Sequence, residues 1–269
     1  MDHLALEKKL VRLVRRAAKI PLARDFSVEQ KSSAADIVTS ADYGVQSFLQ
    51  RELVKLLPGS GFLCEEKNVN DAGRECVWVI DPIDGTTNFA RGIDDYAISV
   101  ALLRAGQPAV GAVYNPVKRE MYSASAGAGA RLNGRRIAVS DTPFGQGLLC
   151  TAMSLYRKEF APVCFDIIAE AYGMCGDIRR FGSCATELCY LASGRCDLYF
   201  ELRVFPWDYA AALLILKEAG GVLKGLHGAE LTFDRPTVLV GANSEENYRK
   251  LEAVVGKYLK SVPYEETLG

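Results

Sequence analysis

Two stretches near the start of the chain place apolar residues at helical spacing. The first predicts an amphipathic helix over residues 3–20 that Pro21 ends, with Lys and Arg between its apolar positions. The second predicts a helix that begins at Thr39, which can cap it, and ends before Pro58. The polar residues 27–35 between these helices are predicted to form a loop.

Short apolar runs bounded by polar residues predict strands in the middle of the chain. Residues 61–64 are a short strand candidate, and the continuous apolar run 76–80 predicts a buried strand that ends at Asp81. Three further runs predict an antiparallel meander, and they lie at residues 97–103, 108–114 and 120–125. The glycine-rich residues 126–136 follow this meander.

The second half of the chain alternates strands and helices. Strands are predicted near residues 147–151, 176–181, 196–201, 221–224 and 237–242. Helices are predicted near residues 157–172, 184–194, 206–219 and 244–259. The pattern therefore predicts an α+β half, residues 1–137, followed by an α/β half, residues 138–269.

Composition and charge exclude several classes of protein. The 269 residues are 49% hydrophobic and 24% charged, which is typical of a globular protein. A net charge of −1 argues against a nucleic-acid partner, because proteins that bind phosphate backbones are usually basic. The chain has two histidines, so a zinc enzyme that needs several imidazole ligands is excluded.

Cysteine usage and hydropathy predict where the protein is found. The eight cysteines form no C-x-x-C pair, so we expect reduced, mostly buried thiols in a cytoplasmic protein. The N-terminal residues are too charged for a signal peptide. The longest apolar runs, such as residues 209–216, are far shorter than the roughly 20 residues that span a bilayer. We therefore expect no membrane association.

One acidic segment is a candidate for chemistry by itself. Asp81 and Asp84, three residues apart, follow the buried strand at a sharp turn. The carbonyl of Ile83 can join them, and Thr86 and its neighbours can begin a helix whose free N–H groups face an anion. Because all of these ligand atoms are oxygens, the segment predicts a Mg²⁺ site beside a cradle for phosphate.

Other polar residues carry weaker signals when taken alone. Glu65 and Glu66 are typical of a solvated charge pair, and Asp42 is typical of an acid at a helix start. Asp208 lies at the start of an apolar helix, which favours a buried position. Cys184 has no histidine near it in the sequence, so we expect it to line a pocket rather than act as a nucleophile.

Five segments together resemble the inositol monophosphatase family of Mg²⁺-dependent, lithium-sensitive sugar phosphatases. They follow the family order from residue 31 to residue 221, and their sequences are KSSAADIVTSAD, CEE, WVIDPIDGTTNFARG, FGSCATELC and FPWDYAA with KEAGG. The resemblance implies a layered αβαβα sandwich of the sugar-phosphatase type. It also implies a homodimer and two or three Mg²⁺ ions in each active site.

The resemblance implies a role for each matching residue. The implied metal ligands are Glu65, Asp81, the Ile83 carbonyl, Asp84 and Asp208. The implied catalytic residues are Asp42, Thr86 and Glu65, and Asp42 and Thr86 form the implied relay that holds and deprotonates the attacking water. The implied substrate contacts are Asp84, Gly85, Thr86, Thr87, Gly182, Ser183, Cys184, Glu201 and Asp208. Lys31 and Glu66 are expected beside the metal ligands without binding the metal themselves.

The implied function is Mg²⁺-dependent hydrolysis of a small sugar or inositol phosphate monoester, inositol monophosphate first of all, by a metal-activated water. A second reading is a phosphatase for fructose 1,6-bisphosphate, whose second phosphate Arg203 could meet, or for another bisphosphate that the same family hydrolyses. A third is a non-catalytic binding role in a transcription or RNA complex. Two positions depart from the usual family pattern, namely Cys64, where glycine is common, and Arg203.

Overall fold

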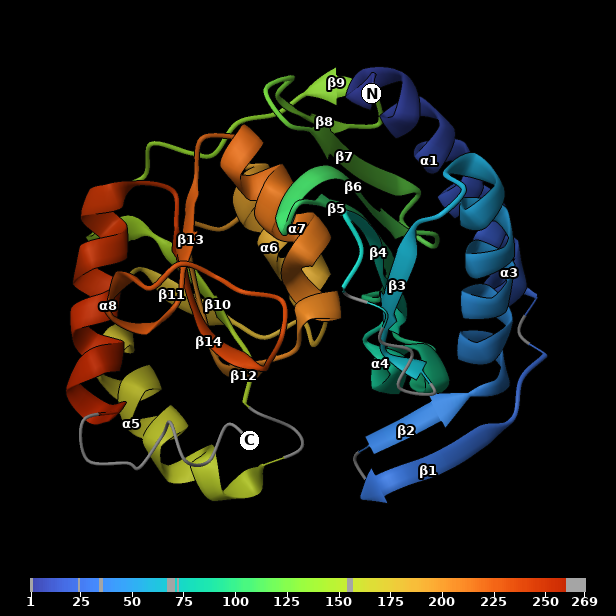
Figure 1. Cartoon of the computed structure of the whole chain (residues 1–269). Coiled ribbons are helices and arrows are strands. Elements are labelled where there is room, and N and C mark those ends of the chain that lie inside the picture. The colour runs from blue at the N-terminus through green and yellow to red at the C-terminus, as the bar shows by residue number, and fades with distance from the viewer. Residues whose placement is uncertain are drawn as a thin grey trace.

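Helices and sheets alternate in five layers (Figure 1). The computed structural model describes residues 2–23, 25–33, 36–66, 71, 73–153 and 157–259. The three helical layers are the pairs α1 (His3–Ala17) and α3 (Ser40–Leu56), α6 (Cys184–Ala192) and α7 (Pro206–Glu218), and α5 (Ala161–Tyr172) and α8 (Glu245–Leu259). This order confirms the expected αβαβα sandwich.

The larger sheet has seven strands in the order β3-β4-β5-β6-β7-β8-β9. Its strands are β3 (Gly61–Cys64), β4 (Cys76–Asp84), β5 (Ala97–Arg104), β6 (Gln107–Asn115), β7 (Glu120–Ser125), β8 (Ala130–Leu132) and β9 (Arg135–Arg136). Strands β3 and β4 are parallel, and every later pair is antiparallel. The predicted meander is therefore confirmed as β5–β7. Strands β8 and β9 lie in the glycine-rich stretch, where the sequence pattern predicted no strand.

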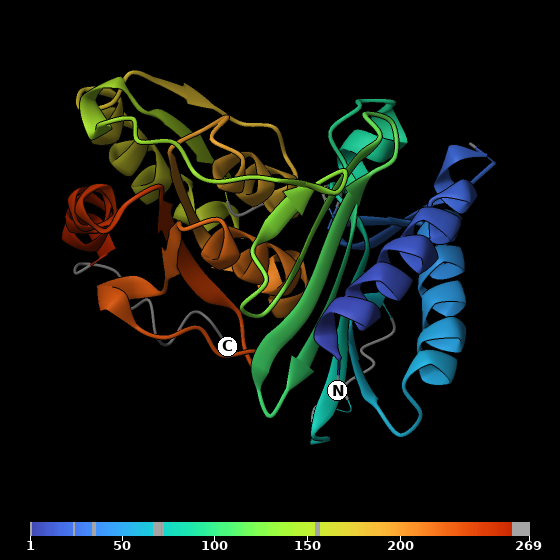
Figure 2. The ribbon, with the colours of Figure 1, turned by 90° about the horizontal axis from the view of Figure 1, so that it is seen from above.

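Strand β4 is buried on both faces, which explains its continuous apolar sequence. Trp78 and Ile80 belong to the core beneath α1 and α3. Val77 and Val79 point to the opposite face and pack in the core with α6 and α7. The view from above shows α1 and α3 on one side of this sheet and α7 on the other (Figure 2).

The smaller sheet has five strands in the order β11-β10-β12-β14-β13. Its strands are β10 (Leu148–Thr151), β11 (Asp177–Arg179), β12 (Leu198–Val204), β13 (Val222–Lys224) and β14 (Thr237–Ala242). Strand β10 is parallel to β11 and β12, whereas β14 is antiparallel to β12 and β13. The two sheets are formed by separate stretches of chain. Helices α6 and α7, which belong to the second half of the chain, nevertheless pack against the larger sheet, which the first half forms. The division at residue 137 therefore stays a prediction.

The remaining elements correct two expectations. In the described ranges they are α2 (Lys19–Leu22), β1 (Val28–Ser33), β2 (Asp36–Thr39), α4 (Thr86–Arg91) and three 3₁₀ turns (Phe144–Gln146, Lys158–Phe160 and Leu226–Gly228). The predicted loop over residues 27–35 is wrong for Val28–Ser33, which pairs antiparallel with β2. Backbone hydrogen bonds support this hairpin without an apolar pattern in β1, and residues 34–35 lie outside the described part. The first helix ends before Ala18, so Pro21 lies within the short α2.

Two expectations from composition can be compared with the structure. All eight cysteines are free thiols, and six of them are buried. Of the helices in the described ranges, none combines the length and the apolar character that crossing a bilayer requires.

Helix α7 packs very close to the larger sheet. Its run of small side chains, Ala210–Ala212, is fully buried and faces Gly111 of β6. A Cβ atom on Gly111 would lie 3.0 Å from the carbonyl oxygen of Ala211 and 3.2 Å from its Cα. Because Asp208 is in the first turn of the same helix, this contact also fixes the position of its carboxylate.

We expect Gly111→Ala to lower the free energy of unfolding by about 1–3 kcal/mol, since the added methyl group meets backbone atoms that cannot rotate away. Denaturant unfolding of the purified protein measures this change. The matched control is Gly73→Ala, where no atom lies within 4 Å of the added carbon. We expect the control to shift stability by less than about 0.5 kcal/mol. Equal effects of both variants would show that the contact carries no strain.

Candidate active site

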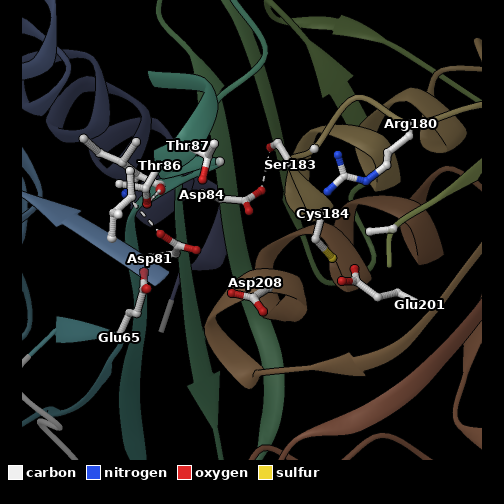
Figure 3. Close-up of a pocket in the computed structure, with 15 residues that line it drawn as sticks. Glu65, Asp81, Asp84, Thr86, Thr87, Arg180, Ser183, Cys184, Glu201 and Asp208 are labelled. Carbon is white, nitrogen blue, oxygen red and sulfur yellow. Dashed lines mark hydrogen bonds between the residues drawn. The ribbon is translucent and has the colours of Figure 1, made fainter. Parts of the chain in front are cut away.

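Strand β4 continues past Asp81 to Asp84 through a β-bulge, so the predicted strand end at Asp81 is wrong. Asp81 pairs with Ser99 and Asp84 pairs with Ala97, so three steps along β4 match two steps along β5. The extra residue bends the strand and re-aims its side chains. As a result, the carboxylates of Asp81 and Asp84 both face one pocket (Figure 3).

The chain then turns sharply into helix α4, as the sequence predicted. The Ile83 N–H donates to Asp81 Oδ1 at 3.0 Å, and the Thr86 hydroxyl donates to the Ile83 carbonyl at 3.0 Å. Gly85 has a φ of 89°, and a Cβ there would lie 3.1 Å from the carbonyl oxygen of Gly182. Only glycine adopts this positive φ so close to a neighbouring backbone without strain. The backbone of Gly85 is therefore exposed to the pocket at this point.

Carboxylates from several elements line the same open pocket. Glu65 directly follows β3, Glu201 is on β12, and Asp208 is in the first turn of α7. The pocket has an empty volume of about 680 Å³, and its lining residues are Ile37, Glu65, Asp81, Ile83, Asp84, Gly85, Thr86, Thr87, Ala152, Arg180, Gly182, Ser183, Cys184, Glu201 and Asp208. Five carboxylates and one guanidinium therefore face this space (Figure 3).

Burial and mutual repulsion raise the pKa values of these acids. The pKa of Asp81 is raised well above its usual value by burial first and by Glu65 second, and that of Asp208 by burial and then by Asp84. Burial raises the pKa of Asp84 to about 6 and that of Glu201 to about 7. The pocket thus gathers buried carboxyl groups whose ionised forms repel one another.

Asp42 lies behind the pocket at the start of α3, fully buried. Its Oδ2 accepts hydrogen bonds from the N–H and the hydroxyl of Thr39, at 2.8 and 2.5 Å. Its Oδ1 is buried and has no hydrogen-bond partner among the described residues. Burial raises the pKa of Asp42 to about 7. Asp42 and Thr86 do not hydrogen-bond to each other in the described part of the chain, so their implied relay stays a prediction.

Lys31 reaches from the β1–β2 hairpin to the acidic pair after β3. Its Nζ lies 3.0 Å from Glu65 Oε1 and 2.5 Å from Glu66 Oε1. Glu66 is buried, and the Gln46 side chain hydrogen-bonds to both its N–H and its carbonyl. Glu66 does not line the pocket, whereas Glu65 does. The structure thus places Lys31 and Glu66 beside the implied ligand Glu65.

The opposite wall of the pocket comes from the start of α6. Ser183 donates from Oγ to Asp84 Oδ2 at 2.6 Å, and the Ala185 N–H donates to the same oxygen at 2.7 Å. These two hydrogen bonds join Asp84 to residues that lie 99 and 101 positions later in the chain. Cys184 is buried, and burial raises the pKa of its thiol well above its usual value. It therefore stays protonated and lines the pocket, as expected.

Sequence reasoning missed the groups that hold this wall in place. Glu187 Oε1 accepts hydrogen bonds from the N–H groups of Phe181 and Gly182 at 2.5 and 2.9 Å. The Asn88 amide donates to the carbonyls of Asp95 and Phe181, each at 2.6 Å. Burial raises the pKa of Glu187 to about 8. A single acid inside the apolar sequence ATELCYLA was the available signal for Glu187.

The expected role of Arg203 also changes. Its guanidinium carbon lies 4.7 Å from the ring centre of Phe205, and Arg203 does not line the pocket. The basic side chain that does line it is Arg180, in the loop after β11 (Figure 3). The sequence placed Arg203 between Glu201 and Asp208, but the register of β12 shifts between Glu201 and Val204, so Arg203 does not share the orientation of Glu201, which lines the pocket.

The candidate ligand atoms are of the chemical type that a hard divalent cation prefers. The candidate side-chain ligands are all carboxylates, and their pKa values are raised by burial first and by mutual repulsion second, both of which a bound cation would offset. Among the described residues, however, no three His, Cys, Asp or Glu side chains form a ready-made metal site.

The raised pKa values predict how stability depends on pH without divalent cations. A carboxyl whose pKa is higher in the folded state binds more protons there, so stability rises as pH falls toward the pKa of the unfolded state. Folded values of about 6 for Asp84, about 7 for Asp42 and about 8 for Glu187 place the window between about pH 8 and about pH 5. Thermal unfolding in chelator should show a rising Tm as the pH is lowered across this window.

A variant pair checks the origin of this effect. Glu187→Gln should flatten the upper part of the pH dependence, whereas Glu75→Gln, whose side chain is 72% exposed, should leave it unchanged. A Tm that is flat or falls as the pH is lowered would contradict the assignment.

The chain is similar to known proteins over most of its length. The pattern of the Inositol monophosphatase family matches residues 3–260. An inositol-1-monophosphatase of Mesorhizobium japonicum is 36% identical over 253 residues, covering 90% of this chain and 93% of the relative. The Nus factor SuhB of Escherichia coli is 33% identical over 225 residues, covering 81% and 84%. The solved IMPase of Thermotoga maritima has a TM-score of 0.86 at 30% identity, covering 97% and 99%. This chain therefore belongs to the inositol monophosphatase family.

Proposed function

We propose that this protein hydrolyses a phosphate monoester of inositol or another small sugar with the help of Mg²⁺, inositol monophosphate first of all. The observation that carries this proposal is the group of five carboxylates around one pocket, in a chain of the inositol monophosphatase family. Oxygen ligands with almost no histidine favour Mg²⁺ over zinc or copper. Family membership supports a phosphatase, and the substrate itself is the proposed part.

In this proposal, Glu65, Asp81, the Ile83 carbonyl, Asp84 and Asp208 hold two or three Mg²⁺ ions. Bound Mg²⁺ supplies positive charge that offsets the phosphate dianion and lowers the pKa of water. The raised pKa values of Asp81 and Asp208 support the assignment, because a cation between these carboxylates would favour their ionised forms. Lys31 keeps Glu65 and Glu66 in place beside the site.

The proton from the attacking water goes to the protein in this mechanism. Asp42 has one carboxyl oxygen without a partner among the described residues and a pKa of about 7, which suits a proton acceptor near neutral pH. The Thr86 hydroxyl, which now donates to the Ile83 carbonyl, would turn to link the water with Asp42. The backbone at Gly85 and Thr87 would hold the phosphate oxygens.

The rest of the substrate would meet the wall formed by α6 and β12. Ser183, Cys184 and Glu201 line this wall, and their positions are fixed by contacts within the protein. The Tyr199 hydroxyl donates to Glu201 Oε2 at 2.7 Å, which leaves the other carboxylate oxygen for a sugar hydroxyl. Cys184 offers a buried thiol, so no covalent intermediate on this residue is part of the proposal.

A second candidate function is binding in a transcription complex. Its support is the similarity to proteins named Nus factor SuhB, from Escherichia coli and from Vibrio cholerae, the latter 37% identical over 214 residues. Such a role would use the outer surface and would not require the carboxylates of the pocket. A homodimer and a cytoplasmic location likewise stay predictions.

The direct test is phosphate release by the purified protein. We expect release from inositol 1-phosphate with Mg²⁺, complete loss in excess EDTA, and recovery when Mg²⁺ is restored, because the phosphate has no other source of balancing charge at the carboxylates. Li⁺ should inhibit, as the family resemblance implies. Unchanged turnover in excess EDTA would contradict the proposal.

Two isosteric changes separate a metal ligand from its neighbour. Asp81→Asn should lower kcat roughly 10³-fold, a loss on the scale of removing one electrostatic contact to the transition state. Glu66→Gln should lower it only about 10–100-fold, because Glu66 acts through Lys31 and Glu65. In EDTA, Asp81→Asn should also unfold at a higher temperature than wild type, since one repelling charge is removed.

Equal losses of kcat for the two variants would reject the ligand assignment. The Asp81→Asn variant also separates the two candidate functions. If it loses phosphatase activity but replaces the wild-type protein in cells, the cellular role is binding. If it fails in both assays while remaining folded, catalysis is the role.

A further inference from the structure

Helix α1 carries a row of positive charges on its solvent side. Figures 1 and 2 show the helix on the outside of the molecule, beside α3. Its lysines and arginines are all exposed and recur at helical spacing, so they share one side of the helix. Together with the next lysine along the chain they form the basic face, which consists of Lys8, Lys9, Arg12, Arg15, Arg16 and Lys19.

Little negative charge lies close to the basic face. The one acid of α1, Glu7, is buried, and its two carboxylate oxygens accept hydrogen bonds from the hydroxyls of Ser123 and Ser125, each at 2.8 Å. Glu52 of α3 lies 3.3 Å from Arg16, but two cations of its own helix share it. In the described part of the chain, the other cations of the basic face form no ion pair.

The positive charge is confined to this stretch of the chain. Residues 3–20 contain six lysine or arginine residues and one acid, so they carry a charge of +5, whereas the whole chain carries −1. The rest of the chain therefore carries −6. At a rise of about 1.5 Å per residue, Lys8 and Arg16 lie roughly 12 Å apart along the helix axis. The basic face is thus a short positive surface on a protein that is otherwise negative.

Folding alone does not account for this pattern, because like charges three or four residues apart destabilise a helix. Helix α8 of the same protein carries the stabilising arrangement. Its Arg249 and Lys250 each lie one turn after a glutamate, Glu245 and Glu246, at N–O distances of 3.7 and 2.7 Å. The basic face has no such pairs within α1, so a partner that brings negative charge would relieve its repulsion.

We infer that the basic face is a docking surface for a short acidic segment of another protein. Charge complementarity carries this inference, since carboxylates spaced along such a segment can meet the lysines and arginines spaced along α1. The inference goes beyond the proposed function and does not depend on it, because no residue of the basic face lines the pocket.

Other polyanions match the basic face less well. A nucleic-acid strand longer than the face would continue onto the rest of the protein, whose net charge of −6 would repel its phosphates. A helix that lies on a membrane buries its apolar side in lipid, but the apolar side of α1, with Leu6, Leu10 and Leu13, is already buried in the core. A short acidic segment meets neither obstacle.

The test measures binding of a fluorescein-labelled peptide of ten glutamates by fluorescence anisotropy. Wild-type protein should bind one peptide per chain at about 0.05 M salt and lose it at about 0.5 M, because salt screens exposed charges. The triple variant Lys8→Gln, Lys9→Gln and Arg12→Gln should weaken binding about tenfold. This variant should unfold at no lower temperature than wild type, since it removes charges that repel each other.

The matched control replaces three exposed cations on separate segments, Lys158, Lys217 and Arg235, by glutamine. It has the same net charge as the first variant and should weaken binding less than about twofold. Equal weakening by both variants, or no binding by wild-type protein, would overturn the inference.

Two further probes test the choice of partner, namely a ten-nucleotide uridine RNA and vesicles that contain phosphatidylserine. Weaker binding of both than of the peptide supports an acidic protein segment. Tighter binding of either one, lost in the basic-face variant and kept in the control, would overturn it. Phosphate release should be the same in both variants and in wild type, so the proposed function succeeds or fails independently of docking.

Discussion

One electrostatic constraint shapes the pocket. Its carboxylates repel each other, yet the fold holds them so that they face the same space. The fold imposes this arrangement through backbone contacts. Asp81 accepts a hydrogen bond from its own turn, and Asp208 accepts the Phe205 N–H at 2.9 Å at the start of α7. Burial then strengthens the repulsion, because a low dielectric screens the charges weakly. Packing of the surrounding layers offsets the free energy that this arrangement costs. A cation that binds there would remove the repulsion, and this relief would add to its binding free energy.

The two halves of the chain meet at this pocket through short, specific contacts. Ser183 and Ala185 bind Asp84, while Asn88 binds the carbonyl of Phe181. Glu187 supports the loop from the other side. A substrate between the two walls would therefore touch groups whose relative positions are already fixed before binding, which lowers the entropy lost on binding.

Much of this arrangement could be predicted from the sequence, because its signals are local. The buried strand, the turn at Gly85 and the helix at Thr86 all follow from neighbouring residues. The bulge in β4 could not be predicted, since it depends on the register with β5. Arg180 and Arg203 show the same limit: both lie near acidic residues in the sequence, and only the register shift in β12 and the loop after β11 determine which one faces the pocket. Strand β1 was missed because its sequence, VEQKSS, has no alternation of apolar and polar residues.

The close approach of α7 to Gly111 also limits how this chain can exchange parts with its relatives. A chimaera joined near residue 137 would combine one protein's larger sheet with another's α7. If the incoming helix carried a bulkier residue in place of Ala211, or the sheet a side chain in place of Gly111, the helix would be displaced from the sheet. Its first turn would move with it, and Asp208 would leave the other carboxylates. Recombination within the family is therefore expected to keep these two small residues together as a pair.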